Sequence, residues 1–168
     1  MSDTNYQAPF RRRREQKTDY KQRKNLLKSG KPRAVVRISN NHTRVHLSHY
    51  EREGDVNTAQ TISKELEDYG WEHHTGNLPA AYLTGYLAGH KAESSEAILD
   101  LGLREKNKGG RMFAALKGLI DAGIEIPAGD SIFPEESRLR GEHIKEMKDV
   151  DVPANFETVK ENIEGDFE

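Results

Sequence analysis

The residues with the clearest chemical capacity in this sequence are four consecutive arginines near its beginning, Arg11 to Arg14. Guanidinium groups bind phosphates through paired hydrogen bonds and stack on flat bases. Twelve Lys and Arg against three acids give the first 37 residues a net charge of +9. The whole 168-residue chain carries −2, so the remainder carries −11. This asymmetry is typical of a segment that binds a polyanion, and it indicates nucleic acid.

Aromatic side chains are interleaved with these charges. Tyr6, Phe10 and Tyr20 offer flat surfaces on which unpaired bases can stack. Low apolar content and charge repulsion predict that residues 1–17 are disordered in the free protein. The candidate RNA contacts of this segment are its aromatic and basic residues, namely Phe10, Arg11, Arg12, Arg13, Arg14, Lys17, Tyr20, Arg23, Lys24, Lys28 and Lys31.

A helix is predicted to follow the arginines. Thr18 or Asp19 can cap it, and Gly30 and Pro32 stop it after about residue 29. Basic side chains spread around most of its surface. The helix is therefore either one that lies on phosphates or a solvated surface helix.

Residues 33–49 give the clearest structural signal, a β-hairpin. Residues 34–38 and 43–47 have the composition and alternation of strands. A two-residue turn at Asn40 and Asn41 would require positive φ at both and would fix the register. Val36 then faces Val45, and this side of the hairpin becomes core.

The opposite side of the hairpin is predicted to be basic. Arg37 faces Arg44, and Arg33 lies on the same side, so these three arginines are the candidate contacts of the hairpin. Like charges directly opposed on a sheet cost up to roughly 1 kcal/mol. An anion over both would remove that cost, although two long side chains can also splay into water.

Beyond the hairpin, the pattern alternates between helices and a strand. Pro79 suits the first turn of a helix to about residue 91, and Gly85 and Gly89 within it are expected where another backbone comes close. The other predicted elements are a helix capped by Asn57 and ended by Gly70, a strand over 97–102 buried on both faces, a helix from Met112 to Ala122, and a short helix from Arg138 to Met147.

Two further segments carry charge. The loop from Lys106 to Arg111 has two glycines ahead of a helix, so it either holds a phosphate on free backbone amides or is a plain loop. The segment after residue 145 is acidic. It is predicted to be mobile, apart from a short docking helix indicated by Phe156 and Ile163.

The motifs favour no metal, no cofactor and no catalytic site. The chain has no cysteine, which excludes disulfides and thiolate metal sites. His42 and His46 are four strand positions apart, about 13 Å at ~3.3 Å per residue, which is too far to share one ion. Ser29-Gly30-Lys31 resembles the end of a phosphate-binding loop but lacks the earlier glycine and the Ser or Thr after Lys31.

The bulk composition limits the class of protein. Hydrophobic residues make up 34% and charged residues 32% of the chain, which predicts one domain with a modest core and polar extensions. The chain has neither an apolar run of about 18 residues nor a signal-peptide apolar region, so no membrane partner is expected. We expect a cytoplasmic protein.

Several separated motifs resemble, in the same order, the large-subunit ribosomal protein family that binds 5S rRNA. This family is called ribosomal protein L-eighteen in bacteria and archaea, and its eukaryotic counterpart is L-five. The resemblance runs from about Ala8 to about Ile144, is closest to the archaeal branch and is poorest after Met147. The matching segments are Arg11–Tyr20, Leu27–Arg33, Ser39–His42, Tyr69–Trp71, Thr75–Gly85, Ala97–Gly102 and Lys117–Gly123.

The resemblance implies an α/β fold, a three-layer mixed sheet with packed helices and a ribonuclease-H-like topology without its catalytic acids. Together with the charge pattern of the chain, we expect a basic arm and helix (1–32), an α/β rRNA-binding domain (33–145) and an acidic C-terminal tail (146–168). The implied role is structural rather than enzymatic, with no small-molecule substrate. The protein would bind 5S rRNA and help attach it to 23S rRNA in the central protuberance, beside neighbouring large-subunit ribosomal proteins.

By position, the resemblance assigns RNA contacts to Arg11–Arg14, Lys17, Tyr20, Arg23 and Lys24 in the arm, to Asn40 and His42 in the turn, and to the segment from Thr75 to Asn77. Two other functions stay open. An RNA-processing enzyme on the same scaffold would need carboxylates clustered near Asp100. A basic-armed adaptor would instead bind the acidic surface of a protein.

Overall fold

The computed structural model describes residues 7–148 and 150–167. It confirms the predicted class, an α/β fold with a mixed four-stranded sheet packed with helices. The spatial order of the strands is β3-β2-β1-β4, with β4 parallel to β1 and the other pairs antiparallel. The strands are β1 (Arg33–Ile38), β2 (Thr43–His49), β3 (Val56–Ile62) and β4 (Ile98–Asp100).

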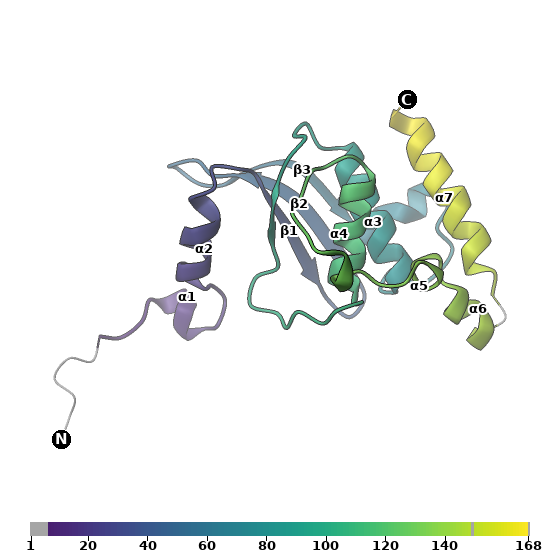
Figure 1. Ribbon diagram of the computed structural model, residues 1–168, viewed down its shortest axis with the longest axis horizontal. Coiled ribbons are helices and arrows are strands. Elements are labelled where there is room, and N and C mark those ends of the chain that lie inside the picture. Colours follow the sequence, from purple (N-terminus) through teal and green to yellow (C-terminus); the bar gives the residue numbers. More distant parts are fainter. Residues whose placement is uncertain (1–6, 149, 168) are drawn as a thin grey trace, which may run out of the picture.

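The helices flank this sheet. Figure 1 shows α1 and α2 on one side of it and α3 and α4 on the other, with α7 packed beyond α3. Within the described ranges, no helix combines the length and apolar content that a bilayer crossing requires. The helices are α1 (Arg11–Arg14), α2 (Tyr20–Leu27), α3 (Leu78–His90), α4 (Arg111–Asp121), α5 (Glu136–Arg140), α6 (Glu142–Lys148) and α7 (Val152–Phe167), with 3-10 helices η1 (Ser63–Tyr69) and η2 (Asp130–Ile132).

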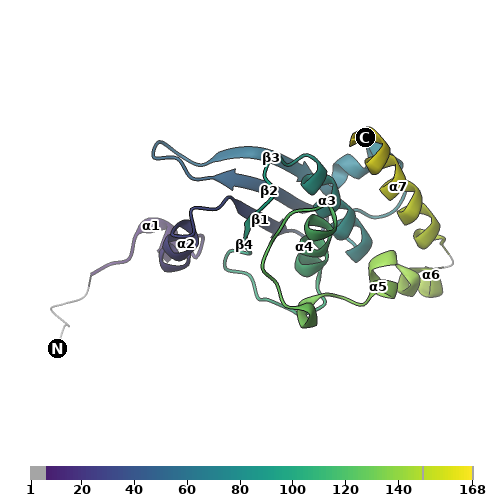
Figure 2. The same ribbon diagram turned by 45° about the horizontal axis from the view of Figure 1, so that its top comes forward.

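The charge asymmetry of the sequence places basic and acidic helices at opposite ends of the molecule. The turned view in Figure 2 again places the basic helices α1 and α2 at one end and α7, with its many acids, at the other. The acids of α7 thus lie away from the basic end.

The register of the β1–β2 hairpin is as predicted at every pair from residue 33 to 38. The turn lies at Asn40 and Asn41 as predicted, but its expected positive φ angles are wrong, because in the described parts of the chain Gln16 is the one residue other than glycine with positive φ. The Ser39 amide instead donates to the His42 carbonyl at 2.8 Å, and the Ser39 hydroxyl accepts from the His42 amide at 3.0 Å. The Ser39 side chain therefore accepts the hydrogen bond that a backbone carbonyl accepts in an ordinary two-residue turn, and the register is preserved.

The helix predicted from Asn57 is wrong over its first half, because residues 56–62 form strand β3. Ala59 and Thr61 are buried whereas Gln60 between them is exposed, which is strand alternation. Only η1 is helical, and Gly70 ends it as predicted, with φ +91°. The open edge of β2 supplied partners that an isolated helix would lack.

Helices α3 and α4 pack with their backbones in close contact. A Cβ on Gly85 would lie 1.9 Å from the carbonyl oxygen of Ala115, and one on Gly118 would lie 2.1 Å from that of Tyr82. This confirms the close approach expected at Gly85. Helix α3 is buried over residues 78–89, because the sheet lies against one of its sides and α7 against another.

The acidic C-terminal segment forms helix α7, so the prediction that it is mobile is wrong. Phe156 and Ile163 are buried in it, as the docking helix required. The Tyr69 hydroxyl donates to Asp166 at 2.9 Å, and the Tyr86 hydroxyl donates to another α7 carboxylate at 2.6 Å. Apolar residues spaced for one helical face, together with these phenol–carboxylate bonds, hold the acidic helix on the protein.

Two smaller predictions also change. Strand β4 lies at an edge of the sheet, so Ile98 and Leu99 are half-buried instead of buried on both faces. The helix predicted from residue 138 to 147 is divided into α5 and α6 by Gly141, whose φ of +86° ends α5. A Cβ at Gly141 would also lie 2.6 Å from Val152, so α7 packs directly against this break.

Replacing Gly85 with Ala should destabilise the protein, because the added methyl group meets backbone that cannot move without separating α3 from α4. We expect the free energy of unfolding to fall by roughly 1–3 kcal/mol or more. Urea denaturation would measure it. The control is Gly165→Ala in α7, where a Cβ meets nothing within 4 Å and a gain of about 0.5–1 kcal/mol is expected. Equal effects of the two substitutions would contradict the packing described.

Candidate nucleic-acid interface

A row of alternating charges crosses the sheet between helix α2 and strand β4; we call it the charge row. Both oxygens of Asp55 accept from the Arg23 guanidinium at 2.9 Å, and Asp55 also accepts from Arg33 at 2.6 Å. Arg33 continues to Asp100 at 3.0 Å, and the other Asp100 oxygen accepts from Arg37 at 3.0 Å. The row joins α2, the β2–β3 connection, β1 and β4, and so fixes the basic helix to the sheet.

Arg33 lies inside this row, which corrects its predicted place on the exposed basic face. Only 5% of its side chain is exposed, and two carboxylates neutralise it. We therefore leave Arg33 out of the candidate RNA contacts. Arg37 keeps 42% of its side chain exposed, and Arg44 opposite it is exposed. The basic face is real but consists of these two arginines.

The two carboxylates of the row are held in the charged form. Burial acts to raise the pKa of Asp100, but the charge and hydrogen bond of Arg37, the Gly102 amide and Arg33 outweigh it and place that pKa below its ordinary value. The pKa of Asp55 is lowered in the same way, since the bonds and charges of Arg23 and Arg33 outweigh burial. The row is therefore fully ionised at neutral pH.

Asp100 is also the residue on which an RNA-processing enzyme would depend. Its two oxygens accept from Arg33, Arg37 and the Gly102 amide. Among residues 7–148 and 150–167, no three His, Cys, Asp or Glu side chains group as a metal site would require. The arrangement positions arginines, and it offers no paired carboxylates for metal-assisted cleavage.

The arm folds back against α2, which differs from the disordered segment expected over residues 7–17. The rings of Phe10 and Tyr20 meet edge to face with centroids 5.4 Å apart. Arg13 pairs at 3.3 Å with Asp19, the residue that caps α2. Phe10 remains 74% and Tyr20 40% exposed, so both rings stay open to a stacking base. Tyr6 lies outside the described residues.

An open groove of about 700 Å³ lies between the arm and the segment after β4; we call it the arm groove. Apart from its cations, the groove is lined by Gln16, Leu101, Gly102 and Leu103, and none of the residues that line it is acidic. Sequence reasoning missed Arg104, because it stands among mixed charges in a loop and only the fold brings it to the arm. The cations of the groove come from three segments and are Arg13, Arg14, Lys17, Arg37 and Arg104.

The hairpin turn and the segment before α3 lie side by side. The Thr75 hydroxyl donates to the Asn41 carbonyl at 2.9 Å and lies 3.1 Å from Nδ1 of His42. The Asn77 side chain accepts an α3 amide at 2.8 Å as the helix cap. Thr75 and Asn77 therefore hold the loop and the helix in place, and we do not retain them as RNA contacts. Asn40 is exposed and His42 half-buried.

The remaining predicted contacts differ in their partners. Lys24 and Lys28 are exposed on α2 and its end. Lys31 pairs with Glu96 at 2.7 Å, an exposed ion pair of small energetic value that an RNA phosphate can replace. Arg23 is committed to the charge row, so its task is to position α2.

The chain matches a family model described as ribosomal large subunit proteins 60S L5 and 50S L18, over residues 4–95 and 88–129. It is 47% identical over 163 residues to the large ribosomal subunit protein uL18 of Methanothrix thermoacetophila, covering 95% of this chain and 96% of the relative. The protein of the same name from Halorubrum lacusprofundi is 46% identical, with 97% of each chain covered. That from Korarchaeum cryptofilum is 54% identical over 83% of this chain and 73% of the relative. The coverage in the first two includes most of the acidic C-terminal segment.

Replacing Asp100 with Asn should destabilise the protein by on the order of 3 kcal/mol at pH 7, because two arginines lose their shared carboxylate. The folded-state pKa of Asp100 is lowered, so its contribution is complete above the unfolded value near 4 and is lost as pH falls through the folded value. The difference in unfolding free energy between wild type and variant should therefore be constant above about pH 5 and shrink in acid.

Denaturation series at several pH values would measure this difference. Asp130→Asn, which replaces an exposed carboxylate, serves as the control and should stay within about 0.5 kcal/mol of wild type. A difference for Asp100→Asn that does not change with pH would show that its charge is not what stabilises the row.

Proposed function

The chain belongs to the family of ribosomal large subunit proteins 60S L5 and 50S L18, and from this premise we propose that it is a structural constituent of the large ribosomal subunit that binds 5S rRNA. It helps attach 5S rRNA to 23S rRNA in the central protuberance, beside neighbouring large-subunit proteins. This role requires a surface that holds RNA without cutting it.

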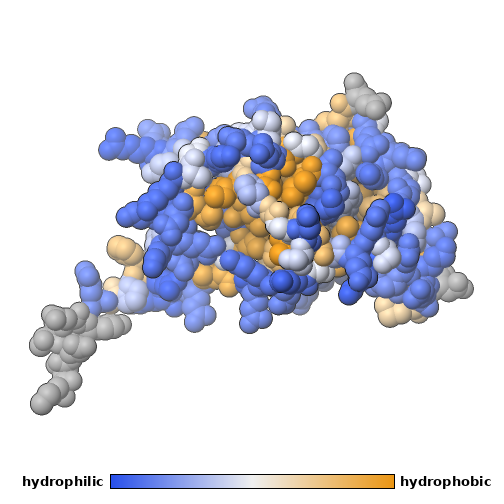
Figure 3. Space-filling model, in the orientation of Figure 1, coloured by the Kyte–Doolittle hydropathy of each residue, from blue (hydrophilic) through white to orange (hydrophobic). Residues whose placement is uncertain are grey.

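The arm groove is the observation that carries this proposal. Cations from the arm, from β1 and from the β4–α4 loop converge on one open space whose lining contains no acid. Figure 3 shows hydrophilic residues gathered over α2 and along the edge where the β4–α4 loop runs. Phosphate contacts of this kind supply most of the affinity and fix the position of RNA, whereas bases supply specificity. The exposed rings of Phe10 and Tyr20, in the arm and in α2, suit unpaired bases.

The fold prepares this surface before RNA arrives. Helix α2 is tied to the sheet by the charge row, and α1 is tied to α2 by the Phe10–Tyr20 contact and the Arg13–Asp19 pair. Ordering a segment on binding costs affinity, so a partly formed arm loses less of its contact energy. The acidic helix α7 at the other end repels RNA and turns the basic end toward it.

A basic-armed adaptor for an acidic protein is the competing function. Both would use the same cations, but only the RNA-binding role uses exposed aromatic rings for stacking. The two differ in what accompanies the purified protein. Co-purified RNA, seen as a raised ultraviolet absorbance ratio and identified as 5S rRNA by sequencing, is the expected result.

Replacing Arg14 and Lys17 together by Gln should weaken 5S rRNA binding without disturbing the charge row. Each lost phosphate contact should lower the slope of log affinity against log salt by ~0.7–0.9, so the double variant should lose about 1.5. A filter-binding or fluorescence titration between low and physiological salt would measure it.

The control is Lys64→Gln with Lys148→Gln, two exposed lysines that do not line the arm groove. It removes the same charge and should leave the slope almost unchanged. If both double variants lose the same slope, net charge rather than the groove determines binding, and the proposed site is wrong.

A further inference from the structure

A second groove of about 630 Å³ opens where α4 begins; we call it the α4 groove. Its apolar residues Ile38, Leu78 and Met112 are each 8% exposed and form its floor. Its remaining lining is polar or glycine. The residues above the floor are Arg104, Glu105, Asn107, Gly109, Gly110, Arg111 and Arg138.

The three arginines of this groove are unpaired with acids of the described residues. Among residues 7–148 and 150–167, Arg104, Arg111 and Arg138 form no ion pair within 4.0 Å. Arg111 donates to the carbonyls of Ser39 and Gly76 at 3.0 and 2.7 Å, so its position is fixed. Burial and the nearby charge of Arg104 lower the pKa of Arg111. The fold thus holds like charges near one another with a single lining acid, Glu105.

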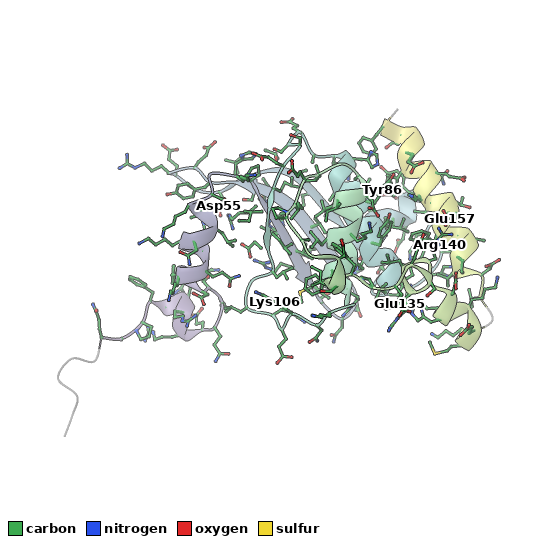
Figure 4. The ribbon with its side chains drawn as sticks, in the orientation of Figure 1. Asp55, Tyr86, Lys106, Glu135, Arg140 and Glu157 are labelled. Carbon is green, nitrogen blue, oxygen red and sulfur yellow. The ribbon has the colours of Figure 1, made fainter. Side chains whose placement is uncertain are left out.

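In a neighbouring cleft of this protein, basic side chains are instead paired with acids. Lys117 pairs there with Asp121 at 2.8 Å, and Arg140 pairs with Glu136 at 2.8 Å and with Glu157 at 3.5 Å. Figure 4 shows Arg140 close to Glu157 of α7. Arg138 and Arg140 stand two residues apart on the same short helix, yet one lines the α4 groove and the other is neutralised.

Arg104 lines both the arm groove and the α4 groove. Arg104 belongs to the β4–α4 loop, which runs from the arm side of the molecule toward α5. Figure 4 labels Lys106 at the outer edge of this loop. We propose that the α4 groove is a second RNA-binding site, which takes the sugar-phosphate backbone of the same 5S rRNA as that RNA continues from the arm groove across Arg104. This inference rests on the proposed function and adds a path for the RNA.

The chemistry of the groove favours RNA over an acidic polypeptide. Three guanidinium groups present donors suited to phosphate oxygens, and that of Arg111 is held in place by backbone carbonyls. The amides of Gly109 and Gly110 donate to the carbonyls of Ile132 and Asn107 at 2.9 and 3.1 Å, so they are not free to bind a phosphate and the arginines supply the contacts. The apolar floor can accept the face of a base. The volume of the groove lies within the range of roughly 300–1,000 Å³ in which small-molecule groups are bound.

Arg138→Gln and Arg140→Gln form a matched pair for the test, since both remove one exposed arginine of α5. With 5S rRNA as the probe, Arg138→Gln should lower affinity about fivefold and the salt slope by ~0.7–0.9, which corresponds to one phosphate contact. Arg140→Gln should change neither. Combining Arg138→Gln with Arg14→Gln should multiply the separate losses, because the two residues line different grooves.

Arg138→Gln behaving like Arg140→Gln, while Arg14→Gln still weakens binding, would overturn the second site and leave the proposed function standing. An acidic polypeptide would then be the remaining candidate ligand of the α4 groove. Weak, salt-insensitive binding by the wild type itself would instead contradict the proposed function. Circular dichroism and a thermal melt of each variant would show that the fold is retained.

Discussion

The structure depends on one electrostatic constraint, the two carboxylates that hold three arginines across the sheet. Asp55 and Asp100 each pair with two of the three arginines Arg23, Arg33 and Arg37. These ion pairs attach α2 to the sheet. A nearly buried arginine is costly unless its charge is paired and its hydrogen bonds are made. Here the same pairing that satisfies Arg33 also locates the basic helix. Local stability and the placement of the proposed RNA-binding surface are therefore determined by the same contacts.

This constraint divides the cations of the basic end into two kinds. Arg23 and Arg33 are used within the protein, whereas Arg13, Arg14, Lys17, Arg37 and Arg104 border open space. Arg37 belongs to both kinds, since it also pairs with Asp100, and Arg13 and Lys17 form exposed pairs with Asp19 and Glu15. Exposed ion pairs such as that of Lys31 with Glu96 contribute little stability and exchange readily for phosphate. The acids of α7 are held at the far end by Phe156, Ile163 and two tyrosine hydroxyls. The molecule thus presents one basic end to a polyanion.

The sequence predicted best where short-range chemistry decides the structure. The hairpin register followed from the position of the two-residue turn, the close approach at Gly85 from two glycines in a helix, and the end of η1 from Gly70. The φ angles of the turn were wrong for a local reason, since the Ser39 hydroxyl accepts from the His42 amide. The other failures lie where distant partners decide, as in residues 56–62, which became a strand because β2 offered a free edge. Arg33 could not be recognised as internal, and Arg104 could not be recognised as part of the site, because both depend on segments far away in the sequence.

The most direct test is the affinity of Asp55→Asn for 5S rRNA, measured at a temperature where the variant is folded. This substitution removes a negative charge, so attraction by net charge alone would make binding tighter. If the charge row positions the basic helix, binding should instead weaken several-fold despite the added positive charge, because α2 and the arm lose their attachment through Arg23. Unchanged or tighter binding by Asp55→Asn would contradict the claim that this row organises the interface.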